Sequence, residues 1–325
     1  MPVPRRRRPA RPGVPPHGGD RTVQLTGRTR VAGAPVNHGI YQPDEPEFGA
    51  EDLLASLARD GYDGIDSGPI GYLGTGETLA RRLSAAGLGL AGGWVDLRYD
   101  DPGGFAADLA GLDAALDAFT AVPVDDPRFA PRPTLACPGD PARMARPGVP
   151  RDPGSGLPAD AWPGFAARVQ RAADRCRERG LEPVFHYHLG TVVESEAEAD
   201  RLLDLTDIAV CLDTGHLLLA GGDPVSAARR WAGRIGQVHL KDADLAIHER
   251  VRAAGGGLTD VVAAGGFCPL GAGDVDFPAV LAALDETGYT GWLVIEQDAP
   301  ARGRDLDRTR ADQAANRRWL DGVRR

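Results

Sequence analysis

The stretch Val210-Cys211-Leu212-Asp213-Thr214-Gly215-His216 decides the expected fold. It contains the end of an apolar run, residues 208–212, that has the length of a buried strand and stops at Asp213 and His216. Two further apolar runs also end in polar ligand-type residues: Ile235-Gly236-Gln237-Val238-His239-Leu240-Lys241-Asp242 and Trp292-Leu293-Val294-Ile295-Glu296-Gln297-Asp298. Three strands with such residues at their carboxyl ends predict one converging metal or acid/base site.

The rest of the chain predicts eight strands that alternate with helices. The strands are expected at residues 31–38, 62–66, 88–95, 133–137, 182–188, 208–212, 235–240 and 291–296. The helices are expected at residues 51–60, 78–86, 105–119, 165–179, 196–205, 224–231, 245–254, 277–287 and 306–323. Strands separated by helices pair in parallel through right-handed crossovers. We therefore expect an α/β fold, a single-domain (β/α)8 TIM barrel over residues 29–325.

A doubly wound open sheet is the alternative fold, but no G-x-G-x-x-G motif follows the first strand. The glycine-rich residues 71–76 lack the lysine of a phosphate-binding loop, so we expect no nucleotide cofactor there. Residues 138–163, rich in proline and glycine, form a long loop that is expected to be either a lid or disordered. Residues 242–273 form a second long excursion.

Composition places the chain among acidic globular proteins. The net charge is −9, although residues 1–30 carry eight arginines and one aspartate, so the remainder is more acidic still. This acidity argues against a nucleic-acid partner, and no long apolar run predicts a membrane span. The arginine- and proline-rich residues 1–28 are expected to be a disordered tail rather than a secretory signal. Four scattered cysteines fit a cytoplasmic location.

Histidines gather at the predicted strand ends. Five of the seven, namely His38, His186, His188, His216 and His239, lie at or just after a strand. With Asp213 and Glu296 they supply imidazole and carboxylate groups, which suit Mn²⁺, Co²⁺, Zn²⁺ or Fe²⁺. Because His186 and His188 alternate with one intervening residue, both are expected on the same face of their strand.

Structural roles for the same residues remain open. Asp213 could cap the segment that follows its strand, and His216 could orient another ligand rather than act directly. A core position for His239 and a structural ion pair between Glu296 and Lys241 are further alternatives.

Several stretches of the chain resemble a known superfamily. The matching stretches are Phe185-His186-Tyr187-His188-Leu189-Gly190-Thr191-Val192-Val193-Glu194, Cys211 to Leu217, Val238 to Asp242, Phe267 to Gly273, and Gly291 to Asp298. They resemble the sugar phosphate isomerase/epimerase superfamily of xylose isomerase-like TIM barrels, and within it the inosose (2-keto-myo-inositol) dehydratases. The resemblance runs from about residue 31 to 298 and is strongest after residue 182.

The resemblance implies a divalent metal, with Mn²⁺ or Co²⁺ favoured over Mg²⁺, Zn²⁺ and Fe²⁺. Its ligands would be Asp213, His239 and Glu296, and His186 stands where the superfamily usually has glutamate. That departure leaves open whether His186 binds the metal. It also favours the dehydratase branch, whose members often carry His-x-His-x-Gly-Thr.

The implied reaction is dehydration of a keto-inositol through an enediolate. His188 and Glu296 are the candidate acid and base, with His216 close to the substrate and Lys241 holding a hydroxyl or an oxyanion. His38, Trp94 and Phe267 are candidate substrate contacts, although Trp94 and Phe267 could equally be packing residues. The partner is a small polyol or keto-sugar, and homo-oligomerisation stays open.

Two other functions compete with dehydration. Epimerisation or isomerisation of a ketose or sugar phosphate would use the same metal but needs two opposed bases. A non-catalytic sugar-binding barrel would be expected to have broken metal ligands, whereas Asp213, His239 and Glu296 are intact. An endonuclease is disfavoured by the acidic body and by too few histidines for a trinuclear site.

Overall fold

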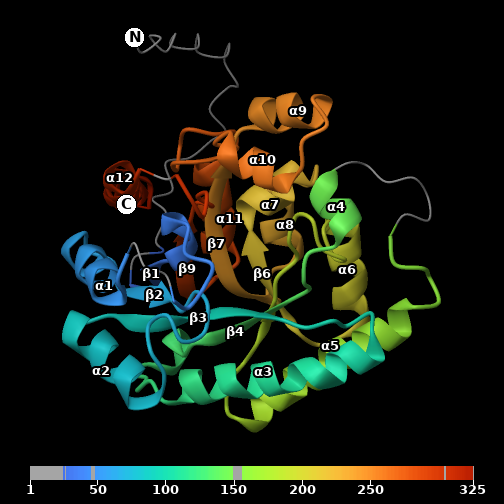
Figure 1. Ribbon diagram of the computed structural model, residues 1–325, viewed down its shortest axis with the longest axis horizontal. Helices are drawn as coiled ribbons and strands as arrows, with labels where there is room; N and C mark the ends of the chain where they lie inside the picture. Colours follow the sequence, from blue (N-terminus) through green and yellow to red (C-terminus); the bar gives the residue numbers. More distant parts are fainter. Residues whose placement is uncertain (1–24, 26, 45–47, 149–155, 304, 325) are drawn as a thin grey trace.

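The computed structural model describes residues 25, 27–44, 48–148, 156–303 and 305–324. Within them, eight parallel strands form a closed barrel (Figure 1). Each strand pairs with the next along the chain, and the last pairs with both β7 and β1 to close the ring. The strands are β1 (Thr29–Gly33), β2 (Gly64–Asp66), β3 (Gly89–Asp96), β4 (Arg132–Ala136), β5 (Val184–Phe185), β6 (Ala209–Asp213), β7 (Ile235–Ala243) and β9 (Gly291–Glu296). The TIM barrel prediction is confirmed.

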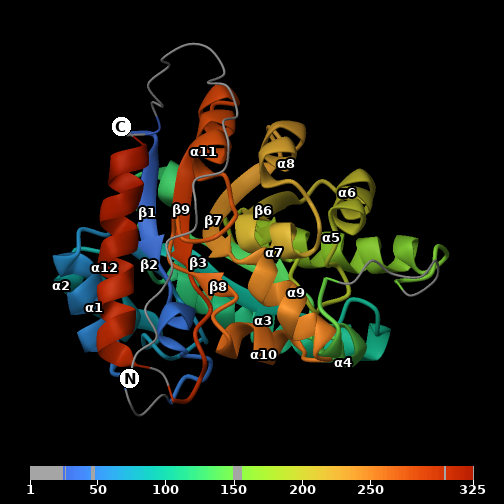
Figure 2. The ribbon, with the colours of Figure 1, turned by 90° about the horizontal axis from the view of Figure 1, so that it is seen from above.

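Helices cover the outside of this barrel, as Figures 1 and 2 show. Apolar residues at helical spacing bury one face of most of these helices; in α1 these are Leu53, Leu54 and Leu57. Aspartates cap several helices, such as Asp101 before α3 and Asp305 before α12. The helices are α1 (Ala50–Arg59), α2 (Gly76–Ala86), α3 (Pro102–Thr120), α5 (Trp162–Glu178), α6 (Glu196–Leu205), α8 (Pro224–Arg230), α11 (Phe277–Glu286) and α12 (Leu306–Val323).

The first strand is shorter than the sequence suggested. Strand β1 ends at Gly33, and Pro35–His38 form the 3-10 helix η1 instead of continuing the strand. Proline has no N–H to donate to a neighbouring strand and its fixed φ suits the first turn of a helix. A second 3-10 helix, η2 (Pro127–Phe129), precedes β4.

Strand β5 is also shorter than predicted, because its regular pairing ends at Phe185 and the chain turns at residues 188–193. The N–H of His188 donates to the carbonyl of Val193 at 3.0 Å, and that of Thr191 donates to the carbonyl of His188 at 3.1 Å. His188 therefore lies on the turn above the strand, whereas the N–H of His186 still donates to the carbonyl of Leu135 on β4 at 2.7 Å.

Short elements lie above the carboxyl ends of the strands, most of them in the two long connections. They are α4 (Pro141–Ala145), α7 (Thr214–Leu219), α9 (Leu245–Ala253), α10 (Leu258–Ala263) and β8 (Phe267–Cys268), which pairs antiparallel with β7. Helices α4, α9 and α10 lie together on one side of the barrel (Figure 2). The expected loop at residues 138–163 thus contains a helix, and its residues 149–155 lie outside the described part.

The predicted tail, residues 1–28, falls mostly outside the described residues. Of those that are described, Leu25 is fully buried and Arg28 forms an ion pair with Asp285 of α11, so the packed structure begins earlier than residue 29. In the part of the chain that the structure describes, no helix is both long and apolar enough to cross a membrane.

Candidate metal centre and active-site cavity

A cavity of about 1060 Å³ opens at the carboxyl ends of the strands. Its wall is largely apolar, with polar groups contributed by successive strands around the barrel. These groups include Asp66, Trp94, His186, His188, Lys241 and Glu296. Such a position is where TIM barrels carry their active sites, because the loops from all eight strands converge there.

Four side chains predicted as metal ligands meet beside this cavity. Donor atoms of His186, Asp213, His239 and Glu296 all lie within 4.8 Å of one another. Nε2 of His186 is 3.5 Å from Oδ2 of Asp213. Nδ1 of His239 is 3.8 Å from the same oxygen and 3.1 Å from Oε2 of Glu296. The sequence placed these four residues on different strands, and the fold brings them together.

Asp213 caps the helix that follows its strand and also directs an oxygen to the ligand group. One carboxylate oxygen, Oδ1, accepts from the N–H of His216 at 2.8 Å and so caps α7. The other, Oδ2, is buried and accepts no hydrogen bond from any described residue. A buried carboxylate oxygen without a donor is costly. The ammonium of Lys241, 3.6 Å from Oδ2, offsets part of that cost, and a divalent cation bound directly to this oxygen would remove the rest.

The donor set of this group fits a divalent transition metal. Two imidazoles and two carboxylates are the mixture that Mn²⁺, Co²⁺, Fe²⁺ and Zn²⁺ accept. The charge of the pair of carboxylates matches that of a divalent ion. The donor atoms of His186, Asp213, His239 and Glu296 are therefore arranged to hold one.

A buried glutamine sets the orientation of His239. Oε1 of Gln237, in the barrel interior, lies 3.3 Å from Nε2 of His239. The amide nitrogen of Gln237 donates to the carbonyl of Ala91 at 3.0 Å, which fixes the oxygen on the histidine side. Nε2 of His239 therefore carries the proton, and Nδ1 is the nitrogen that faces Asp213 and Glu296.

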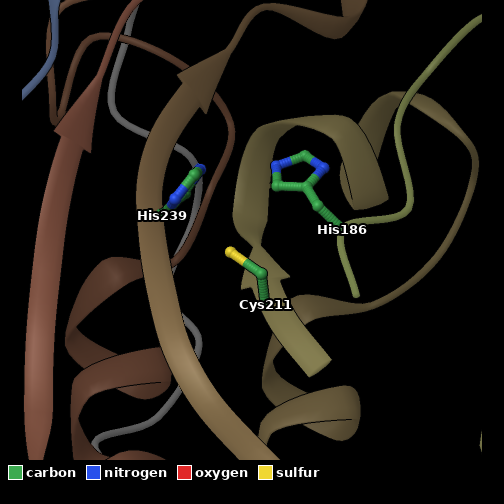
Figure 3. Close-up of side chains that lie close together, drawn as sticks. All are labelled: His186, Cys211 and His239. Atoms are coloured by element: carbon green, nitrogen blue, oxygen red, sulfur yellow. The ribbon is translucent and has the colours of Figure 1, made fainter. Parts of the chain in front are cut away.

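A thiol lies directly below the ligand group. The sulfur of Cys211, on β6, points to the space between the imidazoles of His186 and His239 (Figure 3). Burial raises the pKa of this thiol. The Cys211 thiol is therefore protonated and uncharged at neutral pH, and it lies beneath the four ligands.

Lys241 lies at the centre of a second polar group beside the first. Its Nζ is 2.9 Å from Nε2 of His216 and 3.0 Å from both Oε2 of Glu296 and Oδ1 of Asp298. It is the only lysine among the 37 lysine and arginine residues of the sequence. Burial lowers the pKa of Lys241, but the surrounding carboxylates outweigh burial and hold the pKa well above its usual range. Lys241 is thus a charged hydrogen-bond donor, and it forms the ion pair with Glu296 that the sequence left open.

His188 presents a free nitrogen to the cavity. Its Nδ1 is 2.8 Å from the carbonyl of Leu189, so that nitrogen donates and Nε2 keeps a lone pair. The ring contacts Trp94 edge-on at 5.2 Å and lies 3.7 Å from the ring of His216. Burial, with the nearby charges of His186 and Lys241, lowers the pKa of His188 to about 3. His188 is therefore neutral at pH 7, so Nε2 has a lone pair to offer, and a pKa this low makes the ring a weak base.

Two of the three expected substrate contacts are placed elsewhere. His38 is buried against Phe48, with ring centroids 5.0 Å apart, and does not line the cavity. Its strand ends at Gly33, so η1 carries it away from the strand end. Phe267 packs behind Lys241 and His216 instead of facing the cavity. Trp94 does line the cavity, against His186 and His188.

The sequence analysis missed three residues of the site: Asp66, Asp298 and Gln237. Asp66 ends β2 and lines the cavity, so the strand-end rule applied to the other strands also indicates it. Asp298 comes two residues after Glu296 and accepts from Lys241. Gln237 lies two residues before His239, which places both side chains on the inner face of β7.

Comparisons with known proteins show the family of the chain. The family described as xylose isomerase-like TIM barrel matches residues 54–322. The rhizopine catabolism protein MocC of Rhizobium meliloti is 34% identical over 269 residues, which cover 78% of each chain. The inosose dehydratase of Geobacillus kaustophilus is 41% identical over 140 residues, which cover 42% of this chain and 46% of that enzyme. The match thus spans about half of the dehydratase.

Solved structures show the same fold at low sequence identity. A D-allulose 3-epimerase from Methylomonas sp. in complex with D-allulose superposes with a TM-score of 0.65 and 17% identity. The superposition covers 92% of this chain and 98% of the epimerase. At this identity the likeness concerns the fold alone.

Proposed function

We propose that this chain, which belongs to the xylose isomerase-like TIM barrel family, is a dehydratase of a keto-inositol, with 2-keto-myo-inositol (inosose) as substrate. The sequence similarity to inosose dehydratases supports this reaction. The observation that carries it is the neutral His188 beside the four-ligand group, because dehydration next to a ketone needs both a base and a site for negative charge. The proposed location is the cytoplasm.

The proposed cofactor is a divalent metal, Mn²⁺ or Co²⁺, held by His186, Asp213, His239 and Glu296. When bound there, such an ion acts as a Lewis acid toward the substrate oxygens. Because Nε2 of His239 is directed to Gln237, Nδ1 is the nitrogen that would face the ion, where it now contacts Oε2 of Glu296 at 3.1 Å. Burial raises the pKa of Glu296, but the charges of His239 and Lys241 outweigh burial and lower that pKa well below its usual range, so this carboxylate stays ionised.

His188 is proposed to remove the proton next to the ketone. Its Nε2 has the free lone pair and faces the cavity, while the Leu189 carbonyl holds the ring through Nδ1. A histidine with so low a pKa becomes a strong acid once protonated. The same ring can therefore give the proton to the departing hydroxyl, so that one C–H and one C–O bond break and one water leaves.

Lys241 is proposed to stabilise the negative charge that develops on the substrate oxygen. It lines the cavity, is charged, and is held by Glu296, Asp298 and His216. A fixed ammonium in a water-poor site stabilises such charge without reorganisation. An arginine could not take its place, because a planar guanidinium is larger and needs a different geometry.

An absorbance assay tests the reaction. The protein, loaded separately with Mn²⁺ and Co²⁺, is mixed with 2-keto-myo-inositol, and the conjugated dione product is followed. Metal-dependent product that Glu296→Gln abolishes and the exposed Glu182→Gln preserves is the expected result. No product from protein that holds its metal would contradict dehydration.

A further inference from the structure

Asp66 presents a carboxylate to the cavity at the end of β2. It is 6% exposed, and the cavity reaches its side chain. Its Oδ1 accepts from the N–H of Gly68 at 2.9 Å. Among the described residues, Oδ2 has no hydrogen-bond donor and Asp66 forms no ion pair. One oxygen is therefore held in place, and the other is available to a ligand in the cavity.

The position of Asp66 relative to the metal ligands defines a second subsite. Strand β2 lies on the opposite side of the sheet order from β6, with β3, β4 and β5 between them on one path and β1, β9 and β7 on the other. The charges of His239 and Glu296 nevertheless reach Asp66: its pKa is raised to about 6, mainly by burial, while His239 opposes this rise and Glu296 adds to it. Asp66 thus lines the same cavity as His186 and Glu296, from the strand that is farthest from β6 in the ring.

The chemistry of Asp66 suits a hydroxyl group. At pH 7 a carboxyl with this pKa is mostly ionised and accepts hydrogen bonds strongly. The lining around it is mostly apolar, so no competing donor from the described residues satisfies Oδ2. A ring polyol held at one edge by the metal ligands would present a remote hydroxyl to this oxygen.

We infer that Asp66 binds a ring hydroxyl remote from the reacting carbons, and so selects cyclic polyols over shorter keto-sugars. The inference rests on the proposed keto-inositol substrate. It assigns Asp66 to specificity rather than to proton transfer, since His188 and Lys241 already lie at the reacting end.

The test measures binding of myo-inositol, which cannot undergo the proposed dehydration, to the metal-loaded protein by calorimetry. Asp66→Ala and Asp66→Asn are compared with Asp117→Asn, an exposed aspartate on α3 that pairs with Arg179. Because the variants lose a hydrogen bond to a charged group, we expect the dissociation constant to rise about 10- to 100-fold in the Asp66 variants. The control variant is expected to bind as wild type does.

Singly deoxygenated inositols identify the contact. Wild-type protein should bind one of them about 10- to 100-fold more weakly than myo-inositol, and Asp66→Ala should bind that analogue and myo-inositol alike. Equal losses for every analogue in both proteins would overturn the inference, as would failure of wild type to bind myo-inositol. Asp66-dependent binding without any dehydration of 2-keto-myo-inositol would uphold the subsite and reject the proposed reaction.

Discussion

Oε1 of Gln237 lies 3.3 Å from Nε2 of His239, and this contact decides which nitrogen of the histidine faces the metal ligands. The same oxygen accepts from the hydroxyl of Thr134 at 3.1 Å. The side chains of Gln237 and Thr134 are buried in the barrel interior. The orientation of a ligand is thus set by residues that are deeper in the barrel than the site itself.

Replacing this glutamine should weaken metal binding without unfolding the barrel. In Gln237→Met the imidazole of His239 loses its acceptor and can present either nitrogen. Changes behind a ligating histidine typically cost about 10- to 100-fold in metal affinity. Calorimetric titration with Co²⁺ or Mn²⁺ measures the metal affinity, and Gln170→Met on the surface of α5 is the control. Unchanged affinity in a folded Gln237→Met protein would show that Gln237 does not orient His239.

Removing Lys241 should have opposite effects on metal binding and on turnover. Its Nζ lies 3.0 Å from Oε2 of Glu296 and 3.6 Å from Oδ2 of Asp213, so its charge opposes a cation at those oxygens. We expect Lys241→Met to bind Co²⁺ at least about tenfold more tightly. Turnover should fall by about 10²- to 10³-fold, because the donor to the substrate oxygen is lost.

A matched variant separates charge from shape at this position. Lys241→Arg keeps the positive charge, so it should not gain metal affinity, and it should not restore turnover. Weaker or equal metal binding in Lys241→Met would contradict competition between the ammonium and the ion.

The ion pair between Arg143 of α4 and Glu198 of α6 should make the stability depend on pH. Nη2 of Arg143 is 2.6 Å from Oε1 of Glu198, and both side chains are largely buried. Burial raises the pKa of Glu198, but hydrogen bonds from Arg143 and from the backbone N–H groups of Ser195 and Glu194 outweigh it and lower that pKa. Because the folded-state pKa is depressed, the stabilisation is complete above the unfolded pKa of about 4.3 and is lost as the pH falls.

Urea unfolding measures this contribution. At pH 7, Glu198→Gln should be less stable than wild type by about 2–4 kcal/mol, since it leaves Arg143 buried without its partner. The difference should shrink as the pH falls below about 4. Glu182→Gln, at an exposed pair with Arg177, should change little. A difference that stays constant with pH would show that the charge of Glu198 is not the cause.

Strong periodicity predicted most of the barrel, and local turn chemistry explains the rest. The last helix was predicted at residues 306–323, where α12 lies, and the structure shows that Asp305 caps it. Strand β5 was predicted too long, since Glu182 to His188 has strand composition but its regular pairing ends at Phe185 and the chain turns at residues 188–193. The spacing of apolar residues in the sequence gives no signal for such a turn.

The candidate site was predictable where ligand-type residues end strongly apolar strands. Asp213, His239 and Glu296 met that condition. Asp66 ends a strand of only three residues, which gives little apolar signal before it. Gln237 was hidden because an amide inside a strand has no motif of its own. Its role appears only once Ala91 and His239 are known to lie on either side of it.

The most direct measurement of the central claim is mass spectrometry of 2-keto-myo-inositol after incubation in D₂O with the Mn²⁺-loaded protein. The account predicts a product that is lighter by one water, formed by wild type and slowed roughly 10²- to 10⁴-fold in His188→Gln. A product of unchanged composition that has gained deuterium would contradict dehydration and assign the same site to epimerisation. Substrate recovered without either change, from protein shown to hold its metal, would contradict the proposed substrate.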